Sequence, residues 1–468
     1  MRTTLPSLLV ACLLLNTALH ADEQPCPPLP TPHQVEWQQM ETYAFIHFGL
    51  NTFTDREWGY GDAPLSSFNP TQLDCEQWVR TFCEAGMKGV ILTAKHHDGF
   101  CLWPTLYTDY SIRNTPYRNG KGDIVGELAQ ACRKYGLKFG VYLSPWDRHQ
   151  AFYGSPLYVN YYHMQLEELL TKYGPIFEVW LDGANGGDGW YGGAKEERRI
   201  DHRNYYDFPA IHAIVRKHQP QAIIFSDGGP GCRWVGNESG YAGTTNWAFL
   251  RIKEVYPGYP KAGELTVGHT DGDTWIPAES DVSIRPGWFY HPNEDERVKT
   301  VDELVNIYYN TVGHNANFLL NFPVDRRGLI PQTDSLRAVA FHQRIMKELS
   351  HNLLLDRKQP ALDGNFQTYL TLPTGKPLTL KLPRRTTIDR LMVQEYIPLG
   401  QRVERFLIEY LDGKEWKRLD AGEETTTIGY KRLLRFSPIQ TRSIRLTILQ
   451  SRATACLSEV AAYSSTGK

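Results

Sequence analysis

Short apolar runs alternate with longer amphipathic stretches through most of the chain, up to about residue 355. The short runs are rich in β-branched and aromatic residues and end at Gly, Pro or polar residues, which is the pattern of buried strands. In the longer stretches apolar residues recur at helical spacing, as in the helices that we expect to begin after Asp74 and Asp123. The strands are predicted at residues 43–48, 88–93, 137–143, 176–181, 222–226 and 315–320.

Strands that alternate with helices indicate a parallel sheet covered by helices. Six or more such units predict an α/β fold of the (β/α)8-barrel type rather than an open doubly wound sheet. No GxGxxG or GxxxxGK[ST] motif follows a predicted strand, which weakens the nucleotide-binding alternative. The alternation fails between residues 230 and 300, where Gly, Pro and Trp are dense, and barrel enzymes often place site-forming loops in such segments.

The pattern changes after about residue 355 to alternation with a period of two. Apolar and polar residues alternate around Leu380 and around Leu446, and Asp412-Gly413 is a hairpin signal. We therefore predict a (β/α)8-like catalytic domain at residues 22–352 and an all-β sandwich at residues 353–468. The segment 22–40 is Pro-rich, and we expect it to be extended.

The N-terminus has the pattern of a secretory signal peptide at residues 1–21. A basic start is followed by a short apolar stretch and then by small residues, with cleavage expected after Ala21. The stretch is too short to span a membrane. A lipoprotein cleavage at Cys12 is the weaker alternative, because the apolar run continues past it. The sequence thus predicts a secreted or periplasmic protein.

Charge and cysteine content narrow the possible partners. The net charge is −2, which gives no electrostatic case for nucleic acid or an anionic membrane as the main partner. Of the 8 cysteines, seven remain after cleavage, so at least one is unpaired or is paired between chains. No CxxC spacing occurs, and we expect no metal site built from cysteine.

Polar residues follow several predicted strands at the point where each strand ends. Asp182 comes after the run 176–181 and precedes a glycine-rich loop rather than a helix, which favours a chemical role over a capping role. Asp227, followed by two glycines, is better interpreted as a turn residue. His96 and His97 are possible metal ligands, but adjacent residues of an extended strand point to opposite sides, so we do not expect one shared ion.

Five ordered motifs make the chain resemble the α-L-fucosidases of glycoside hydrolase family 29 over residues 35–350. The motifs are His47-Phe48-Gly49, Glu57-Trp58-Gly59, Lys95-His96-His97-Asp98-Gly99-Phe100, Trp180-Leu181-Asp182-Gly183 and Arg285-Pro286-Gly287-Trp288-Phe289-Tyr290. The resemblance implies a retaining exo-α-L-fucosidase that works through a covalent fucosyl-enzyme and needs no cofactor. Its implied partners are fucosylated oligosaccharides or glycoconjugates.

The resemblance also implies which carboxyls react. Asp182 would be the nucleophile, and retaining chemistry needs a second carboxyl about 5–5.5 Å away as the acid and then the base. The first candidate is Glu238, because its Gly-Asn-Glu context resembles the branch of the family that cleaves α-1,3- and α-1,4-linked fucose. The rival is Glu279, in the segment where other branches place their acid.

The remaining matches imply contacts with the sugar. Trp288 would cover its apolar side, including the C6 methyl group, and a core role for Tyr142 is nearly as plausible as a contact. The residues that match sugar-contacting positions are His47, Glu57, Trp58, His96, His97, Tyr142 and Trp288. The C-terminal region resembles a discoidin-type carbohydrate-binding module, which would either bind galactosides or support the barrel.

Two other functions stay open at this point. A barrel that kept its pocket but lost its acid would be a non-catalytic fucose-binding protein. A misleading motif match would leave a retaining glycosidase for another sugar. The aglycone, the choice between hydrolysis and transfer, and the oligomeric state are not fixed by the sequence.

Overall fold

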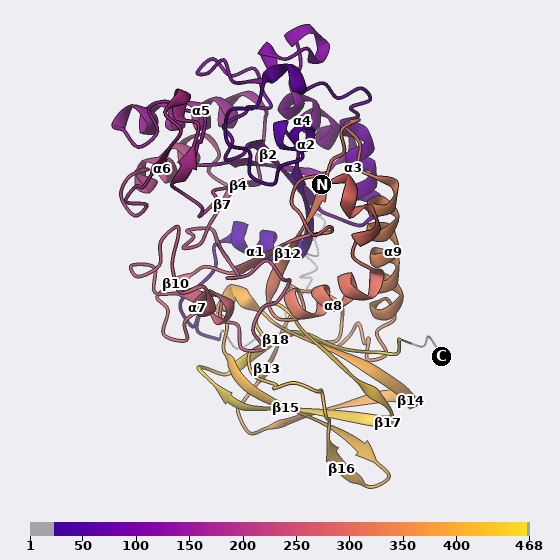
Figure 1. Cartoon of the computed structure of the whole chain (residues 1–468). Helices are drawn as coiled ribbons and strands as arrows, with labels where there is room; N and C mark the ends of the chain where they lie inside the picture. Colours follow the sequence, from indigo (N-terminus) through magenta and orange to yellow (C-terminus); the bar gives the residue numbers. More distant parts are fainter. Residues whose placement is uncertain (1–22, 466–468) are drawn as a thin grey trace, which may run out of the picture.

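Eight parallel strands close a barrel, as predicted (Figure 1). The computed structural model describes residues 23–465, so the predicted signal peptide and Cys12 lie outside the described residues. The strands neighbour one another in the order β1-β12-β11-β8-β7-β4-β3-β2. Their bounds are β1 Thr42–His47, β2 Gly89–Lys95, β3 Lys138–Leu143, β4 Glu178–Trp180, β7 Ile223–Ser226, β8 Cys232–Trp234, β11 Ala278–Ser283 and β12 Ala316–Pro323.

Two barrel strands escape the sequence pattern. The six predicted strands lie within three residues of observed ones, but β8 and β11 were not foreseen. Strand β8 has three residues and follows β7 without an intervening helix. Strand β11 has the sequence Ala-Glu-Ser-Asp-Val-Ser and is buried throughout. Because four of its six residues are polar, its sequence does not have the apolar pattern expected of a buried strand.

Helices cover the outside of the barrel and begin at the predicted caps. The Asp74 carboxylate accepts a hydrogen bond from the Gln77 backbone N–H at 3.0 Å, and Asp123 caps the next helix in the same way. The longer helices are α3 Cys75–Glu84, α4 Ile124–Tyr135, α5 Pro156–Lys172, α6 Phe208–His218, α8 Val301–Thr311 and α9 Gln332–Leu349.

The segment 22–40 is not wholly extended, contrary to the prediction. Residues Pro32–Gln38 form helix α1. Thr31 and Gln34 make a reciprocal capping box, and Pro32 occupies the first turn, where its missing N–H costs nothing. The shorter helices elsewhere are α2 Leu50–Thr54 and α7 Ala262–Val267.

The C-terminal region is an antiparallel β-sandwich, as predicted. Its strands are ordered β13-β18-β14-β17-β15-β16, and β15 and β16 meet at the expected Asp412-Gly413 hairpin. The 19-residue β14 and the 20-residue β17 bend with shifts of register, so the sheet folds over its own apolar core. The bounds are β13 Leu370–Leu372, β14 Pro377–Glu395, β15 Val403–Asp412, β16 Glu415–Arg418, β17 Arg432–Ser451 and β18 Ala455–Tyr463.

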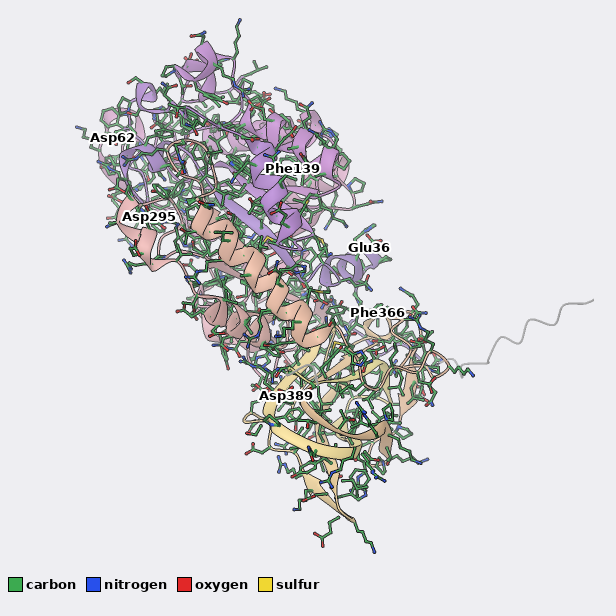
Figure 2. The ribbon with its side chains drawn as sticks, turned by 90° about the vertical axis from the view of Figure 1, so that its right-hand side faces the viewer. Glu36, Asp62, Phe139, Asp295, Phe366 and Asp389 are labelled. Carbon is green, nitrogen blue, oxygen red and sulfur yellow. The ribbon has the colours of Figure 1, made fainter. Side chains whose placement is uncertain are left out.

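The sandwich packs closely against the irregular loops of the barrel. The Gln401 side-chain oxygen accepts a hydrogen bond from the Ala248 N–H at 2.8 Å, and the Asn315 side-chain oxygen accepts one from Tyr430 N–H at 2.7 Å. Phe366 lies at this junction (Figure 2), where it packs on the apolar cluster that contains Trp247 and Tyr430. These contacts give the sandwich a supporting role for the barrel.

Within residues 23–465 the cysteines are unpaired. They are Cys26, Cys75, Cys83, Cys101, Cys132, Cys232 and Cys456. In the same part of the chain we find no helix with both the length and the hydropathy needed to cross a bilayer.

Candidate active site

A cavity of about 320 Å³ opens at the carboxyl ends of the barrel strands. This is the end at which barrel enzymes carry their active sites. Aromatic rings, three histidines and four carboxyls line it together, which suits a polyol with one apolar face. The lining residues are Phe45, His47, Trp58, His96, His97, Trp180, Asp182, Gly183, Ala184, Phe225, Asp227, Trp234, Glu238, Gly258, Tyr259, Asp281 and Trp288.

Asp182 lies two residues after the end of β4, and hydrogen bonds to both of its oxygens fix the carboxylate. Tyr142 O–H donates to Oδ2 at 3.0 Å, and the Ala184 backbone N–H donates to Oδ1 at 2.7 Å. The side chain keeps 22% of its surface exposed toward the cavity. Burial raises the pKa of Asp182 to about 6. The group is thus a positioned carboxylate that is ionised at neutral pH.

Glu238 lies on the loop after β8 and lines the same cavity. Trp288 Nε1–H donates to its Oε2 at 3.2 Å. Burial raises the pKa of Glu238, and the charges of Asp182 and Glu57 raise it further. Two carboxyls of unequal surroundings therefore share one pocket, which is the arrangement that separates an acid from a nucleophile.

The three histidines around the pocket are neutral imidazoles. Burial lowers the pKa values of His47 and His97 to about 3 and that of His96 well below its ordinary value. His47 Nδ1 pairs with the Asn321 side-chain oxygen at 2.8 Å. His97 Nδ1 pairs with Ser144 Oγ at 2.7 Å, which leaves its Nε2 3.8 Å from Asp182 Oδ2.

His96 and His97 line the same cavity, contrary to the expectation that they point to opposite sides. Strand β2 ends at Lys95, so the two residues stand on a turn rather than on extended backbone. Their ring centroids are 4.1 Å apart. The buried His96 Nδ1 has no partner within the described chain, and it is free to meet a ligand.

The sequence model of the Alpha-L-fucosidase family matches residues 30–343. The chain belongs to the α-L-fucosidase family. It is a retaining glycoside hydrolase that acts on α-L-fucosides. The model of the F5/8 type C domain matches residues 351–460, in the sandwich of this fucosidase.

Relatives from plants and bacteria resemble this fucosidase over nearly its whole length. Alpha-L-fucosidase 1 of Arabidopsis thaliana is 40% identical over 98% of this chain and 92% of the plant protein. A glycoside hydrolase 29 family member from an unknown rumen bacterium is 46% identical, with a TM-score of 0.87 over 94% of this chain and 78% of its own. A Ruminococcus gnavus GH29 fucosidase solved with fucose is 32% identical, with a TM-score of 0.83 over 94% of this chain and 96% of its own.

Glu279, the rival acid, lies below the floor of the cavity of this fucosidase. The residue is fully buried on β11 and does not line the cavity. Tyr43 O–H donates to its Oε2, and Trp180 Nε1–H donates to its Oε1 at 2.8 Å. Both carboxylate oxygens are therefore engaged in the barrel interior, and Glu279 serves to hold the Trp180 ring in the floor.

A second glutamate completes this buried group. Glu178 lies beside Glu279 and Cys232, with ligand atoms within 4.8 Å of one another, a spacing that could hold a metal ion. However, Trp37 Nε1–H already donates to Glu178 at 2.8 Å. Burial and the charge of Glu279 raise the pKa of Glu178 well above its ordinary value, so a proton shared between the two glutamates explains the cluster.

Two other predicted site residues, Glu57 and Tyr142, act through neighbours, and a third, Trp58, lines the rim of the cavity. Glu57 does not line the cavity, and its carboxylate accepts hydrogen bonds from the backbone N–H groups of Trp288 and Phe289. It therefore fixes the loop that carries Trp288, and its contact with sugar stays a prediction. Tyr142 is fully buried but reaches Asp182, so it is both a core residue and an orienting one. Trp58 lines the rim and is half exposed.

The turn interpretation of Asp227 was incomplete. Its carboxyl lines the cavity and accepts a hydrogen bond from the Gly258 N–H at 2.6 Å. Burial raises its pKa to about 7. Asp281 is a fourth carboxyl that sequence reasoning missed, and its signal was the polar alternation of Glu279, Asp281 and Ser283 along β11.

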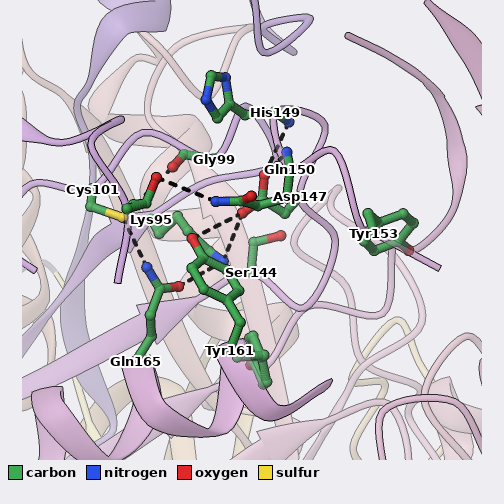
Figure 3. Close-up of polar contacts among 12 residues, drawn as sticks. Lys95, Gly99, Cys101, Ser144, Asp147, His149, Gln150, Tyr153, Tyr161 and Gln165 are labelled. Carbon is green, nitrogen blue, oxygen red and sulfur yellow. Dashed lines mark hydrogen bonds and ion pairs between the residues drawn. The ribbon is translucent and has the colours of Figure 1, made fainter. Parts of the chain in front are cut away.

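A buried ion pair underlies the histidine loop (Figure 3). Lys95 Nζ lies 3.2 Å from Asp147 Oδ2 and 3.0 Å from the Gln165 side-chain oxygen, and both charged side chains are fully buried. Asp147 Oδ1 accepts hydrogen bonds from the N–H groups of His149 and Gln150. At Gly99, with φ +80°, a Cβ would lie 2.3 Å from Asp147 Oδ1, which explains the glycine in that motif.

We predict that Lys95→Met lowers the free energy of unfolding by ~3–5 kcal/mol, because Asp147 would remain buried without its countercharge. Urea unfolding followed by tryptophan fluorescence measures the change. Lys217→Met is the matched control, since Lys217 pairs with Glu167 at the surface and should matter little. Equal stability of the Lys95→Met and wild-type proteins would contradict the prediction.

Proposed function

We propose that this fucosidase removes terminal α-1,3- and α-1,4-linked fucose from glycans, with Asp182 as the nucleophile and Glu238 as the acid and base. One observation carries the assignment of the residues. Asp182 and Glu238 both line the cavity at the carboxyl ends of the strands, whereas Glu279 lies beneath its floor. The presence of both carboxyls also disfavours a non-catalytic fucose-binding protein.

In the first step an Asp182 oxygen attacks the anomeric carbon while the bond to the glycosidic oxygen breaks. Glu238 transfers its proton to that oxygen, so the aglycone leaves as a neutral alcohol and Glu238 becomes a carboxylate. The product is a fucosyl ester of Asp182. Tyr142 and the Ala184 N–H hold the attacking carboxylate in place.

In the second step Glu238 takes a proton from water, and the water oxygen attacks the same carbon. The ester bond breaks, Asp182 returns as a carboxylate, and fucose leaves with its original anomeric configuration. An acceptor sugar hydroxyl in place of water would give transfer through the same intermediate.

The surroundings support binding of a neutral deoxysugar. His47 and His96 offer uncharged ring nitrogens, and Trp288 lies 5.1 Å from the His47 ring between centroids. An indole face suits the C–H side and methyl group of fucose. The signal-like pattern at residues 1–21 supports an exported enzyme that meets extracellular or periplasmic fucosylated glycans.

A panel of fucosylated oligosaccharides tests the linkage preference. We expect release of fucose from α-1,3- and α-1,4-linked substrates at least about tenfold faster than from α-1,2- or α-1,6-linked ones. Fucose release is measured by chromatography, with aryl glycosides of other sugars as controls. Faster release from an α-1,2- or α-1,6-linked substrate would contradict the linkage assignment. Preferred cleavage of an aryl glycoside of another sugar would contradict the assignment of fucose as the substrate.

Azide rescue tests the two carboxyl roles through stereochemistry. With an activated aryl α-L-fucoside, Glu238→Ala should be accelerated by azide and give α-L-fucosyl azide, because azide attacks the fucosyl-enzyme. Asp182→Ala should lose activity by about 10⁴-fold or more and give only the β-azide, because azide then replaces the nucleophile. NMR of the products distinguishes the two anomers.

Glu279→Ala is the matched control for this experiment. The variant removes a buried carboxyl of the same barrel, and we expect no azide product from it. Formation of α-L-fucosyl azide by Glu279→Ala and not by Glu238→Ala would reverse the assignment of the acid.

The pH dependence of kcat/KM should have an acid limb near pH 6, where Asp182 gains its proton. Protonation removes the nucleophile, so activity is lost as pH falls through this value. Activity should also fall at higher pH as Glu238 loses its proton. For a substrate whose leaving group needs no acid, Glu238→Gln should keep the acid limb of the fucosylation step, because that limb belongs to Asp182. An acid limb that disappears in this variant would refute the assignment to Asp182.

A further inference from the structure

Strand β11 presents a row of polar side chains to the barrel interior. Residues that alternate along a strand face the same side, so Glu279, Asp281 and Ser283 point inward. Glu279 is bound by Tyr43 and Trp180, and Ser283 Oγ donates to the Gly287 carbonyl at 2.7 Å. Asp281 lies between them and lines the cavity. Of these three inward-facing residues of β11, Asp281 is the one that these side-chain hydrogen bonds do not engage.

One oxygen of the Asp281 carboxyl lacks a protein partner among the described residues. The residue is 3% exposed, and its buried Oδ1 has no hydrogen bond within the described chain. A buried polar atom without a partner costs free energy, because in the unfolded chain water would bind it. Such an atom in a native protein calls for an explanation, and a ligand that fills the cavity is one.

The depth of Asp281 indicates which part of the substrate would reach it. Asp281 belongs to the barrel strand itself, whereas Glu238 stands on the loop beyond β8. An acid that protonates the glycosidic oxygen lies over the bond between fucose and aglycone. A carboxyl further inside the barrel therefore faces the fucose ring rather than the leaving group.

We propose that Asp281 is a substrate-binding residue of this fucosidase that hydrogen-bonds a ring hydroxyl of fucose. The proposal rests on the proposed function, since it takes Glu238 as the acid that marks the aglycone side. Asp281 supplies its free oxygen to the C2, C3 or C4 hydroxyl, and a sugar without that hydroxyl leaves the carboxyl unpartnered again. Asp281 thereby selects for the hydroxyl by rejecting the deoxy analogue.

The electrostatics of the site are consistent with this role. Burial raises the pKa of Asp281 well above its ordinary value, and the charges of Glu238 and Glu279 act in the same direction. A protonated carboxyl both donates and accepts a hydrogen bond, as a sugar hydroxyl does. It also adds no second negative charge beside the ionised Asp182.

Calorimetry with L-fucose and its 2-, 3- and 4-deoxy derivatives tests the proposal without requiring turnover. In the wild type, one deoxy sugar should bind about tenfold or more weakly than fucose because of the lost bond to Asp281. In Asp281→Ala fucose itself should bind about tenfold more weakly, and the penalty for that one deoxygenation should disappear. Asp281→Asn, whose amide can donate and accept, should keep most of the penalty.

Ser280→Ala is the matched control. Ser280 Oγ is also buried without a partner, but on the opposite face of the same strand, away from the cavity. Its removal should leave all four affinities at their wild-type values. If Asp281→Ala fails to fold, Asp281→Ser replaces it, because the shorter side chain keeps the cavity polar but does not reach the sugar.

Identical deoxygenation penalties in wild type and the short variants would overturn the proposal, as would unchanged affinity for fucose. These outcomes leave the proposed function standing if the wild type still cleaves aryl α-L-fucosides and Asp182→Ala does not. Failure of the proposed function would instead appear in those activity assays, whichever way the binding comparison falls.

Discussion

The active site depends on one buried ion pair, between Lys95 at the end of β2 and Asp147 in the loop after β3. Lys95 is enclosed by the rings of Tyr158, Tyr161 and Tyr162, with centroids 5.2–5.6 Å from its Nζ. Because both charged side chains are fully buried, each would be left as an unpaired buried charge if the two loops moved apart. Separation of the loops would therefore cost a large amount of free energy. The loops in turn join through the bond of His97 to Ser144, which places His97 Nε2 beside Asp182. The ion pair thus positions the surroundings of Asp182, the proposed nucleophile, although it does not line the cavity.

The described histidines around Asp182 are uncharged, and this affects the pKa of the proposed nucleophile. If His97 were cationic, it would lower the pKa of Asp182 and weaken its carboxylate as a nucleophile. Burial keeps His97 neutral, and within residues 23–465 the hydrogen bonds to Asp182 come from a phenol and a backbone N–H. The carboxylate therefore stays ionised at neutral pH while it retains basicity, as its pKa near 6 reflects. The same burial that excludes water from the pocket thus sets the reactivity of the group that attacks.

The sequence predicted the barrel, the sandwich and the carboxyl ends of most strands, because β-branched runs and helix caps are local signals. It failed where tertiary burial hides polar residues. Strand β11 looked irregular because its polar residues Glu279, Asp281 and Ser283 lie inside the barrel rather than at a surface. The histidine pair was misjudged because strand β2 ends one residue before it. Asp227 looked like a turn residue because its partner, Gly258, is distant in sequence. The errors at β11 and Asp227 concern partners that are distant in the sequence, and the error at the histidines concerns the exact residue at which a strand ends.

The two proposed catalytic carboxyls differ in how rigidly they are held, and the difference suits their tasks. Asp182 must meet one carbon atom from one direction, and two hydrogen bonds fix it just past the end of a barrel strand. Glu238 must deliver a proton to one oxygen and later take a proton from another, and it stands on a loop with a single bond from Trp288. Trp288 is itself held by Glu57 through the backbone. Glu57 therefore limits how far the proposed acid can move, through the Trp288 side chain that we also predict to cover the sugar. If Trp288 binds the apolar face of fucose as proposed, the same contact places the acid, because Trp288 donates the hydrogen bond that holds Glu238.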